Sequence, residues 1–251
     1  MEVKGAPCLV VGGARKLGRA IALDLAAQGA SVAISYHTPG PAVDETCAAI
    51  RALSGDAFAT AGDLTVPADA RRIVTEAAAA LGGLRILVYA ASGPFTPQRP
   101  EEIDARQWEA SIGAIAAGFF FCAQSAFAQF RGARRDDHDE AGVIVAITDV
   151  LGVRPTAAFA AHSAAKAAQI ALVQTLAKAW AADGVRVCGV APGPLDLPDD
   201  ARREATERAA QRTALKRLVK PEEIAQAVRF CIESPALTGV NLAVDGGQLL
   251  V

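Results

Sequence analysis

Three side chains in the second half of the chain are of types suited to proton transfer. His162 and Lys166 are four residues apart, and Asp149 precedes His162 by thirteen residues. Four residues make about one helical turn, so His162 and Lys166 would share one face of a helix. Histidine exchanges its proton near neutral pH, and a neighbouring carboxylate favours its charged form. We therefore expect His162 either to act as a general acid or to shape a pocket and hydrogen-bond a substrate.

Asp149 and Lys166 each have two interpretations. Asp149 either orients His162 or contacts a substrate, or it only caps backbone N–H groups at the end of a strand. Lys166 either adds positive potential near an oxyanion that develops at a reacting carbonyl, or it is a solvated lysine on a helix surface. Only the geometry of the folded chain decides between these interpretations.

A second group of residues is suited to a phosphate. Residues 11–19 have the sequence VGGARKLGR and lie between an apolar run of strand length and a helical pattern. Glycines such as Gly12 and Gly18 let the backbone turn tightly and approach a pyrophosphate. The N–H groups and the dipole of the following helix stabilise its negative charge. The loop therefore predicts a dinucleotide site.

The end of the second predicted strand indicates which dinucleotide is bound. Residues 35–38, SYHT, include no acidic side chain that would accept hydrogen bonds from a ribose 2′-hydroxyl. The residues available to surround a 2′-phosphate instead are Arg15, Lys16, His37 and Thr38. The sequence therefore favours NADP(H) over NAD.

The elements that position these residues follow from the alternation of apolar runs with helical patterns. This alternation is typical of βαβ units on a parallel sheet that is buried on both faces. Strands are expected near 7–11, 31–35, 56–60, 85–89, 143–147, 185–190 and 241–244, and helices near 17–28, 42–53, 67–81, 108–131, 157–182 and 221–232. We predict an α/β protein, with residues 1–251 forming a single-domain Rossmann-type doubly wound parallel sheet of about seven strands.

Two stretches interrupt the alternation. Residues 131–140 are dense in opposite charges and predict a solvated loop without chemistry. Residues 194–212 follow a strand at the carboxyl edge of the sheet, where ligands bind in open α/β folds. The prolines and charges of this second stretch favour a substrate lid over a plain connector.

Composition argues against several other classes of protein. The 25 basic and 27 acidic side chains give a net charge of −2, so nothing favours nucleic acid or an anionic membrane as a partner. We identify no apolar run of the roughly 18 residues that cross a membrane and no signal peptide, and expect a cytoplasmic protein. The five widely spaced cysteines predict core residues rather than disulfides or a metal site.

Taken in order, these motifs resemble those of the short-chain dehydrogenase/reductase family over nearly the whole chain. Residues 12–18 resemble its TGxxxGxG turn, Asp63-Leu64 its adenine-contacting pair, Pro192-Gly193 the turn after its sixth strand, and residues 244–247 its C-terminal VDGG motif. The resemblance implies a Rossmann-fold oxidoreductase. The residues expected to hold its cofactor are Gly12, Arg15, Lys16, Leu17, Gly18, Tyr36, His37, Thr38, Asp63, Leu64, Ala90, Ala91, Ser92, Lys166, Pro192 and Gly193.

At the catalytic positions the sequence departs from the family pattern. Lys166 keeps its place, where the resemblance implies hydrogen bonds to the nicotinamide ribose, but His162 replaces the family's Tyr and Asp149 its Ser. Ile115 aligns with an Asn that takes part in the family's proton relay. The family's Asn-Asn-Ala-Gly turn is replaced by residues 89–92, YAAS. The resemblance therefore implies a site that lacks the usual proton donor and its hydrogen-bonding support.

Three functions remain open. The first is an NADPH-dependent ketoreductase for a polycyclic aromatic ketone, in which His162 or a substrate phenol beside the ketone supplies the proton. The Asp-His-Lys pattern resembles that of polyketide ketoreductases acting on angucyclinones in antibiotic biosynthesis. The second is a pteridine- or quinone-type reductase, because Lys16-Leu17-Gly18 and Tyr36-His37 are similar to the pteridine-reductase branch, which also tolerates Asp at the Ser position. The third is an inactive NADP(H) sensor.

The partners follow from the same motifs. The residues expected to contact a small aromatic ketone are Ser92, Gly93, Phe95, His162 and Pro194. Long alanine-rich faces on the helices near 108–131 and 157–182 favour close helix packing. Members of the family usually assemble through the corresponding helices, so the resemblance implies a homo-oligomer, either a dimer or a tetramer.

Overall fold

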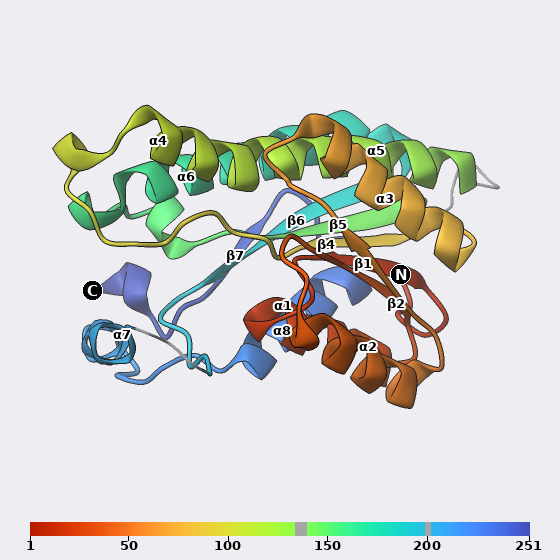
Figure 1. Cartoon of the computed structure of the whole chain (residues 1–251), viewed down its shortest axis with the longest axis horizontal. Coiled ribbons are helices and arrows are strands. Elements are labelled where there is room, and N and C mark those ends of the chain that lie inside the picture. Colours follow the sequence, from red (N-terminus) through yellow and green to blue (C-terminus); the bar gives the residue numbers. More distant parts are fainter. Residues whose placement is uncertain (134–139, 199–201) are drawn as a thin grey trace.

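The computed structural model describes residues 1–133, 140–198 and 202–251. A seven-stranded parallel sheet has the order β3-β2-β1-β4-β5-β6-β7 (Figure 1). The strands are β1 Pro7–Val11, β2 Ser31–Tyr36, β3 Ala57–Ala61, β4 Ile86–Tyr89, β5 Gly142–Ile147, β6 Val185–Pro192 and β7 Asn241–Val244. The predicted doubly wound sheet is confirmed. Its order reverses between β1 and β4, which places a ligand-binding crevice beyond their carboxyl ends.

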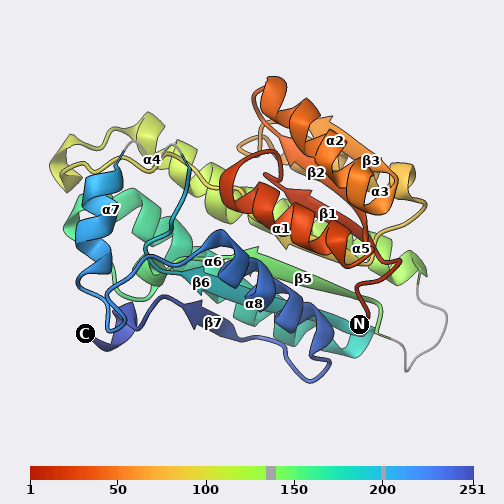
Figure 2. The same cartoon turned by 90° about the horizontal axis from the view of Figure 1, so that it is seen from below.

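Helices cover both faces of the sheet. One layer contains α1 Lys16–Ala27, α2 Pro41–Ser54 and α8 Pro221–Glu233. The other contains α3 Pro67–Leu81, α4 Ala105–Ile112, α5 Gly118–Ala133 and α6 Ala160–Trp180. Figures 1 and 2 show the sheet between these layers, with α7, Arg203–Ala210, beyond its edge. The second layer carries His162 and Lys166 on α6.

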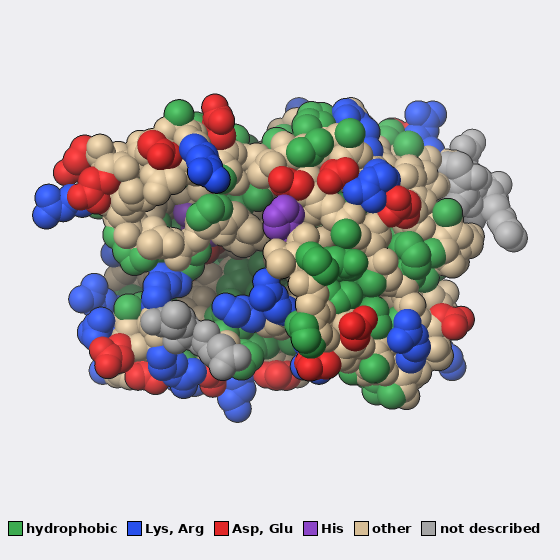
Figure 3. Space-filling view, viewed as in Figure 1, with side chains coloured by type: hydrophobic (Ala, Val, Ile, Leu, Met, Phe, Trp, Pro, Cys, Tyr) green, Lys and Arg blue, Asp and Glu red, His purple; other side chains and the backbone are tan. Residues whose placement is uncertain are grey.

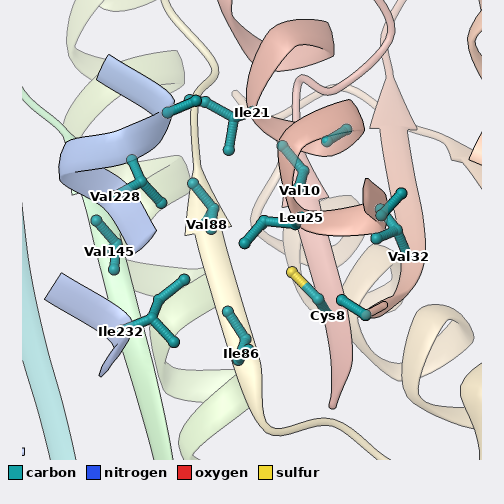
Figure 4. Packing of buried hydrophobic residues seen from close by; sticks show 14 of the residues in the cluster. Cys8, Val10, Ile21, Leu25, Val32, Ile86, Val88, Val145, Val228 and Ile232 are labelled. Atoms are coloured by element: carbon teal, nitrogen blue, oxygen red, sulfur yellow. The ribbon is translucent and has the colours of Figure 1, made fainter. Parts of the chain in front are cut away.

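The strands are buried on both faces because their alternate side chains enter two separate cores. Val10, Val88 and Val145 pack with residues of α1 and α8 on one face (Figure 4). Leu9 and Leu87 pack on the other face with residues of α3, α5 and α6. This alternation follows from the period of two in a strand, so apolar residues at successive positions stabilise both layers.

The helical boundaries differ from the prediction at three places. The helix expected from residue 108 begins at residue 105 and contains a π-helical segment, Gly113–Ala117. The helix expected over 157–182 begins with a 3-10 turn at Ala157–Phe159 and continues as α6. The segment 194–212 contains α7, although residues 199–201 lie outside the described part. Hydrophobic periodicity alone does not distinguish a π-helix or a 3-10 helix from an α-helix. It also gives no signal for a short polar helix such as α7.

The run Ala105–Arg131 corrects one expectation about hydropathy. It contains an 18-residue window with a mean hydropathy of 1.5, and by length and composition alone it is able to cross a membrane. The prediction that no such apolar run exists is therefore wrong for this segment. Its three parts pack against α3 and α6 in one layer of the fold, a position typical of a core helix in a globular domain.

The charged stretch 131–140 is described only at its ends, since residues 134–139 lie outside the described part. Glu140 is not a solvated side chain. Its carboxylate lies 2.6 Å from the buried Arg186 guanidinium, and its backbone carbonyl accepts a hydrogen bond from Arg85 at 2.5 Å. The prediction of a solvated loop is therefore wrong at Glu140. Its ion pair with Arg186 links the start of β5 to β6.

Candidate active site

The loop after β1 forms a cradle in which glycine is required. Gly12 has φ +76°, and a Cβ there would lie 3.0 Å from the Cα of Ala91 in the loop after β4. A Cβ on Gly18 would lie 2.1 Å from the carbonyl oxygen of Gly12. A side chain at Gly12 would collide with the loop after β4, and one at Gly18 would fill the space between the β1 loop and the first turn of α1. The predicted close approach of backbone is therefore present at the switch point of the sheet.

The start of α1 presents backbone N–H groups without a side-chain cap. Arg15 is the N-cap residue, its side chain makes no capping hydrogen bond, and the first turn contains no acidic residue. Lys16 has φ 50°, a left-handed conformation that costs an L-residue roughly 1–2 kcal/mol. The side chains of Arg15 and Lys16 are exposed, whereas Leu17 and Gly18 are buried. This arrangement fits a dinucleotide diphosphate.

The loop after β3 holds an ionised carboxylate near His37. Oδ1 of Asp63 accepts hydrogen bonds from the Thr65 hydroxyl at 2.7 Å and from the Thr65 backbone N–H at 2.8 Å. These bonds, with a smaller contribution from the charge of His37, lower the pKa of Asp63. His37 and Thr38 are exposed, and Tyr36 and Leu64 are half-buried. The loops after β2 and β3 therefore meet at the expected adenosine end of the cradle.

His162 and Asp149 form a hydrogen-bonded pair. Nε2 of His162 lies 3.0 Å from Oδ2 of Asp149, and Oδ1 of Asp149 accepts the backbone N–H of Leu151 at 2.8 Å. Both interpretations of Asp149 therefore hold, because one oxygen orients the imidazole while the other caps the following turn. An ionised carboxylate only accepts hydrogen bonds, so Nε2 carries a proton. Nδ1 is buried and has no partner among the described residues, which leaves it for a ligand.

Lys166 is buried rather than solvated, with 3% of its surface exposed. Its ammonium donates hydrogen bonds to the carbonyl of Ile147 at 2.7 Å and to Oε1 of Gln169 at 3.2 Å. Burial lowers the pKa of Lys166 to about 8, and the charge of Asp149 opposes this shift. The interpretation of Lys166 as a surface lysine is therefore wrong. Gln169 was not among the predicted site residues, although residues 162, 166 and 169 have the spacing of one helix face.

An aromatic wall borders the pair. The rings of Phe95 and Phe159 are stacked with centroids 4.4 Å apart, and the Phe95 ring is tilted against His162 at 4.5 Å. The guanidinium of Arg202 lies 4.2 Å from the centre of the Phe95 ring. The segment predicted as a lid therefore contacts the loop that follows β4. Phe159 and Arg202 were not predicted as site residues, because their approach to Phe95 depends on the folding of three separate loops.

The other residues expected to contact substrate lie at the same edge of the sheet. Ser92 is exposed, and a Cβ on Gly93 would lie 3.1 Å from the Cα of Ser111 on α4. Pro194 is half-buried, and its carbonyl accepts the Val219 N–H at 2.8 Å. Figure 3 shows a hollow between the α4 and α6 layer and α7, with basic side chains around it. A separate cavity of about 480 Å³, lined by Met1 and Arg85 among others, is remote from these residues.

The turn after β6 is braced by the C-terminal motif. The Gly193 N–H donates to the Val244 carbonyl at 3.1 Å, and a Cβ on Gly193 would lie 2.7 Å from the Cα of Asp245. The carboxylate of Asp245 accepts the N–H groups of Gly247 and Leu249 at 2.9 and 2.8 Å. Pro192 is buried. This bracing positions the turn beside the cradle without supplying a catalytic group.

Tyr89 corrects the expectation that hydrogen-bonding support after β4 is lost. Its hydroxyl donates to the carbonyl of Ala114 in the π-helical segment. Burial raises the pKa of Tyr89, so the hydroxyl remains a donor. Ile115 is completely buried and offers no polar group. A Cβ on Gly118 would collide with the Tyr89 hydroxyl and with the carbonyl of Leu64. Tyr89 therefore joins β4 to the π segment.

Within 1–133, 140–198 and 202–251, no three His, Cys, Asp or Glu side chains are grouped so that they could hold a metal ion. All five cysteines are buried and unpaired, as core residues are expected to be.

The family comparison covers nearly the whole chain. The family model described as enoyl-(acyl carrier protein) reductase matches residues 12–248. The cis-4-hydroxycyclohexanecarboxylate dehydrogenase of Sinomonas cyclohexanicum is 34% identical over 248 residues, which are 97% of this chain and 96% of that protein. The 3-oxoacyl-[acyl-carrier-protein] reductase of Synechocystis sp. is 31% identical over 245 residues, which are 96% of each chain.

Solved structures agree with these sequence relationships. A short-chain dehydrogenase from Burkholderia cenocepacia J2315, solved in complex with NADP, superposes with a TM-score of 0.89. It is 31% identical, and the match covers 99% of this chain and 100% of that one. With the fold, the glycine cradle and the family model in agreement, the chain belongs to the short-chain dehydrogenase/reductase family of oxidoreductases.

Proposed function

We propose that this oxidoreductase is an NADPH-dependent ketoreductase that reduces a carbonyl of a polycyclic aromatic polyketide, of the angucyclinone type, in antibiotic biosynthesis. The observation that carries the proposal is the hydrogen bond between His162 and Asp149, beside Lys166 and against the ring of Phe95. A histidine paired in this way binds a substrate differently from a tyrosine hydroxyl. The aromatic wall supports a flat substrate, since stacked or tilted rings attract one another.

The cradle would hold the diphosphate of NADPH. Gly12, Gly18 and the N–H groups at the start of α1 suit this anion. The side chains proposed for the 2′-phosphate are Arg15, Lys16, His37 and Thr38, all of them exposed. When bound, NADPH supplies a hydride to the carbonyl carbon. The NADP complex of the Burkholderia protein supports this choice of cofactor.

Lys166 is proposed to bind the nicotinamide ribose and to stabilise negative charge on the carbonyl oxygen. Its ammonium has three N–H groups, two of which bind Ile147 and Gln169. One N–H group therefore remains for a ribose hydroxyl. The ammonium is removed from water, so its charge acts on a nearby oxyanion more strongly than a solvated lysine would.

We propose that the proton comes from a phenol of the substrate beside the ketone. Neutral His162 uses its Nε2–H toward Asp149, so Nδ1 is an acceptor and has no proton to give. The phenol O–H bond breaks, its proton forms a new O–H bond on the alkoxide, and the phenolate then takes a proton from water. Intramolecular placement gives such a donor a large effective concentration. Nδ1 of His162 then serves to hydrogen-bond and orient the substrate.

A charged His162 is the competing proton donor. With protons on both nitrogens, Nδ1 donates to the carbonyl oxygen while Nε2 stays bound to Asp149. The Asp149 carboxylate favours that form, so the same hydrogen bond supports both sources. The two differ in what they require of the substrate, since only the first requires a phenol.

The proposed setting is a cytoplasmic homo-oligomer, either a dimer or a tetramer. A partly exposed face of α5 and α6 supports a helical interface. Within the chain the rings of Phe127 and Trp180 stack 4.5 Å apart, with the Arg131 guanidinium 5.7 Å from the Phe127 ring centre, and both rings remain half-buried. An association of this kind would cover side chains remote from the cradle. Sedimentation of the purified protein measures the number of subunits.

A substrate panel tests the function. The purified protein is mixed with NADPH and, in separate reactions, a hydroxylated tetracyclic ketone, a dihydropterin and a quinone, while NADPH absorbance is followed. We expect oxidation with the phenolic ketone and no comparable rate with the other two. Turnover of the dihydropterin or the quinone alone would reassign the enzyme to that class of reductase. NADPH binding without turnover of any substrate would favour a sensor.

A binding titration tests the choice of cofactor. Titration with NADPH and with NADH is expected to give the tighter binding for NADPH. Equal or tighter binding of NADH would contradict the roles proposed for Arg15, Lys16 and His37.

A further inference from the structure

Helix α6 carries a buried polar stripe of which the proposed reaction uses only two members. His162, Lys166 and Gln169 are spaced by four and three residues and therefore share one face. Gln169 is completely buried. Burying an amide has a desolvation cost that a leucine of similar volume would avoid. The amide at residue 169 is therefore expected to have a function that offsets this cost.

The hydrogen bond to Lys166 fixes the orientation of the Gln169 amide. An ammonium donates and never accepts, so the atom 3.2 Å from Nζ must be the amide oxygen. Nε2 of Gln169 then points away from Nζ, is buried, and has no partner among the described residues. The amide oxygen thus binds Lys166, whereas the amide nitrogen has no hydrogen-bond partner among the described residues. This orientation indicates that Gln169 acts on Lys166.

Among the described residues, no polar side chain of the neighbouring helix hydrogen-bonds the Lys166 ammonium. The buried Ile115 occupies the position where the family resemblance implies an asparagine. The other acceptor of the ammonium is the backbone carbonyl of Ile147 at 2.7 Å. Gln169 therefore supplies the single side-chain acceptor for Nζ in the described part of the chain.

We propose that Gln169 is a positioning residue, whose amide oxygen holds the Lys166 ammonium charged and aimed so that its third N–H group remains for the cofactor ribose. The inference rests on the proposed function for the identity of that ligand. The hydrogen bond between Gln169 and Lys166 does not itself depend on that ligand.

Few charged groups face Lys166 from the elements around it. Asp149, at the end of β5, is the charge that acts on its pKa, and His162 lies one turn earlier on α6. Arg186 belongs to the opposite end of β6, and the charged residues of α4, Arg106 and Glu109, are exposed. Burial is the main cause of the lowered pKa. Losing an acceptor for the charged form should therefore lower this pKa further.

Titration of Lys166 in the protein without cofactor tests the proposal. The chain has six lysines, so ¹³Cε-lysine labelling gives a simple NMR spectrum, in which the spectrum of Lys166→Met identifies the Lys166 signal. We expect Gln169→Leu to move the titration midpoint of Lys166 down by about one pH unit, a tenfold change in proton affinity. Gln169→Glu should move it up. The exposed Gln174, also on α6, gives the control Gln174→Leu, which should leave it unchanged.

The outcomes separate this inference from the proposed function. An unchanged Lys166 midpoint in folded Gln169→Leu would overturn the inference, whatever substrate the enzyme reduces. If Gln169→Leu does not fold, a failure of Gln169→Glu to raise the midpoint overturns it equally. The dissociation constant for NADPH should rise severalfold in Gln169→Leu and remain at the wild-type value in Gln174→Leu. A shifted midpoint with unchanged NADPH binding would contradict the positioning role.

Discussion

The imidazole of His162 and the carboxylate of Asp149 meet at 3.0 Å across thirteen residues of chain. Asp149 lies just beyond β5, whereas His162 is in the first turn of α6. Because the second carboxylate oxygen accepts the Leu151 N–H, the carboxylate cannot rotate freely. The imidazole is consequently held with Nε2 toward Asp149 and Nδ1 free.

Asp149→Asn tests whether the carboxylate controls His162. An amide presents either a donor or an acceptor to Nε2, so the imidazole is no longer confined to one tautomer. We expect kcat/KM for the ketone to fall roughly tenfold, about 1.4 kcal/mol, as expected for one lost hydrogen bond to a charged group. The charge of Asp149 raises the pKa of Lys166, so the variant should also titrate Lys166 below about 8. Steady-state kinetics and lysine NMR measure the two effects, and an unchanged kcat/KM would contradict the first.

Lys166→Met tests the energetic cost of the buried ammonium. The pKa of Lys166 is about 8 in the folded protein, whereas a lysine in an unfolded chain titrates near 10.4. Between these values the unfolded state binds more protons, so the free energy of unfolding of the wild type should increase with pH. The contribution of this group is at most about 1.4 kcal/mol per pH unit.

Denaturant unfolding from pH 8 to 10 measures that slope, and the difference between wild type and Lys166→Met isolates the lysine. The variant should lack this contribution and bind NADPH more weakly. Parallel pH dependences in the two proteins would show that Lys166 does not titrate in this range. For the wild type, NADPH affinity should fall as pH rises through about 8, because the ammonium loses its charge.

Tyr89→Phe tests the link between β4 and the π segment. The substitution keeps the buried ring, which packs edge-on against Phe119, and removes the donor to the Ala114 carbonyl. One lost hydrogen bond to a part-buried carbonyl costs about 0.5–1.5 kcal/mol, so the free energy of unfolding should fall by that amount. Denaturant unfolding provides the measurement. Tyr36→Phe, at the half-buried end of β2, is the matched control and should change stability by less than about 0.5 kcal/mol.

The order and type of the strands could be predicted because parallel strands buried on both faces are continuous apolar runs. The pairing of Asp149 with His162 could be proposed from spacing, since the family resemblance brings both to one site. The contact of Arg202 with Phe95 could not, because it joins segments more than a hundred residues apart. The π segment at Gly113–Ala117 was hidden for another reason: one extra residue in a turn leaves the apolar pattern nearly unchanged.

Tyr89 illustrates how a departure from a motif can be misinterpreted. The replacement of asparagine by tyrosine suggested a loss of hydrogen bonding, yet the longer side chain reaches the Ala114 carbonyl. Ile115 differs, since its apolar side chain is buried and supplies no polar group. Whether a substituted side chain such as Tyr89 makes a hydrogen bond depends on where the backbone places an acceptor.

The source of the proton is tested most directly by comparing a phenolic ketone with its O-methyl ether in wild type and His162→Phe. We predict that the wild type reduces the phenol and that methylation lowers kcat at least 100-fold, because the intramolecular donor is lost. His162→Phe should raise KM for the phenol while kcat stays within about tenfold of wild type. Equal kcat for the phenol and its ether in the wild type, with no turnover by His162→Phe, would contradict the account and assign the proton to His162.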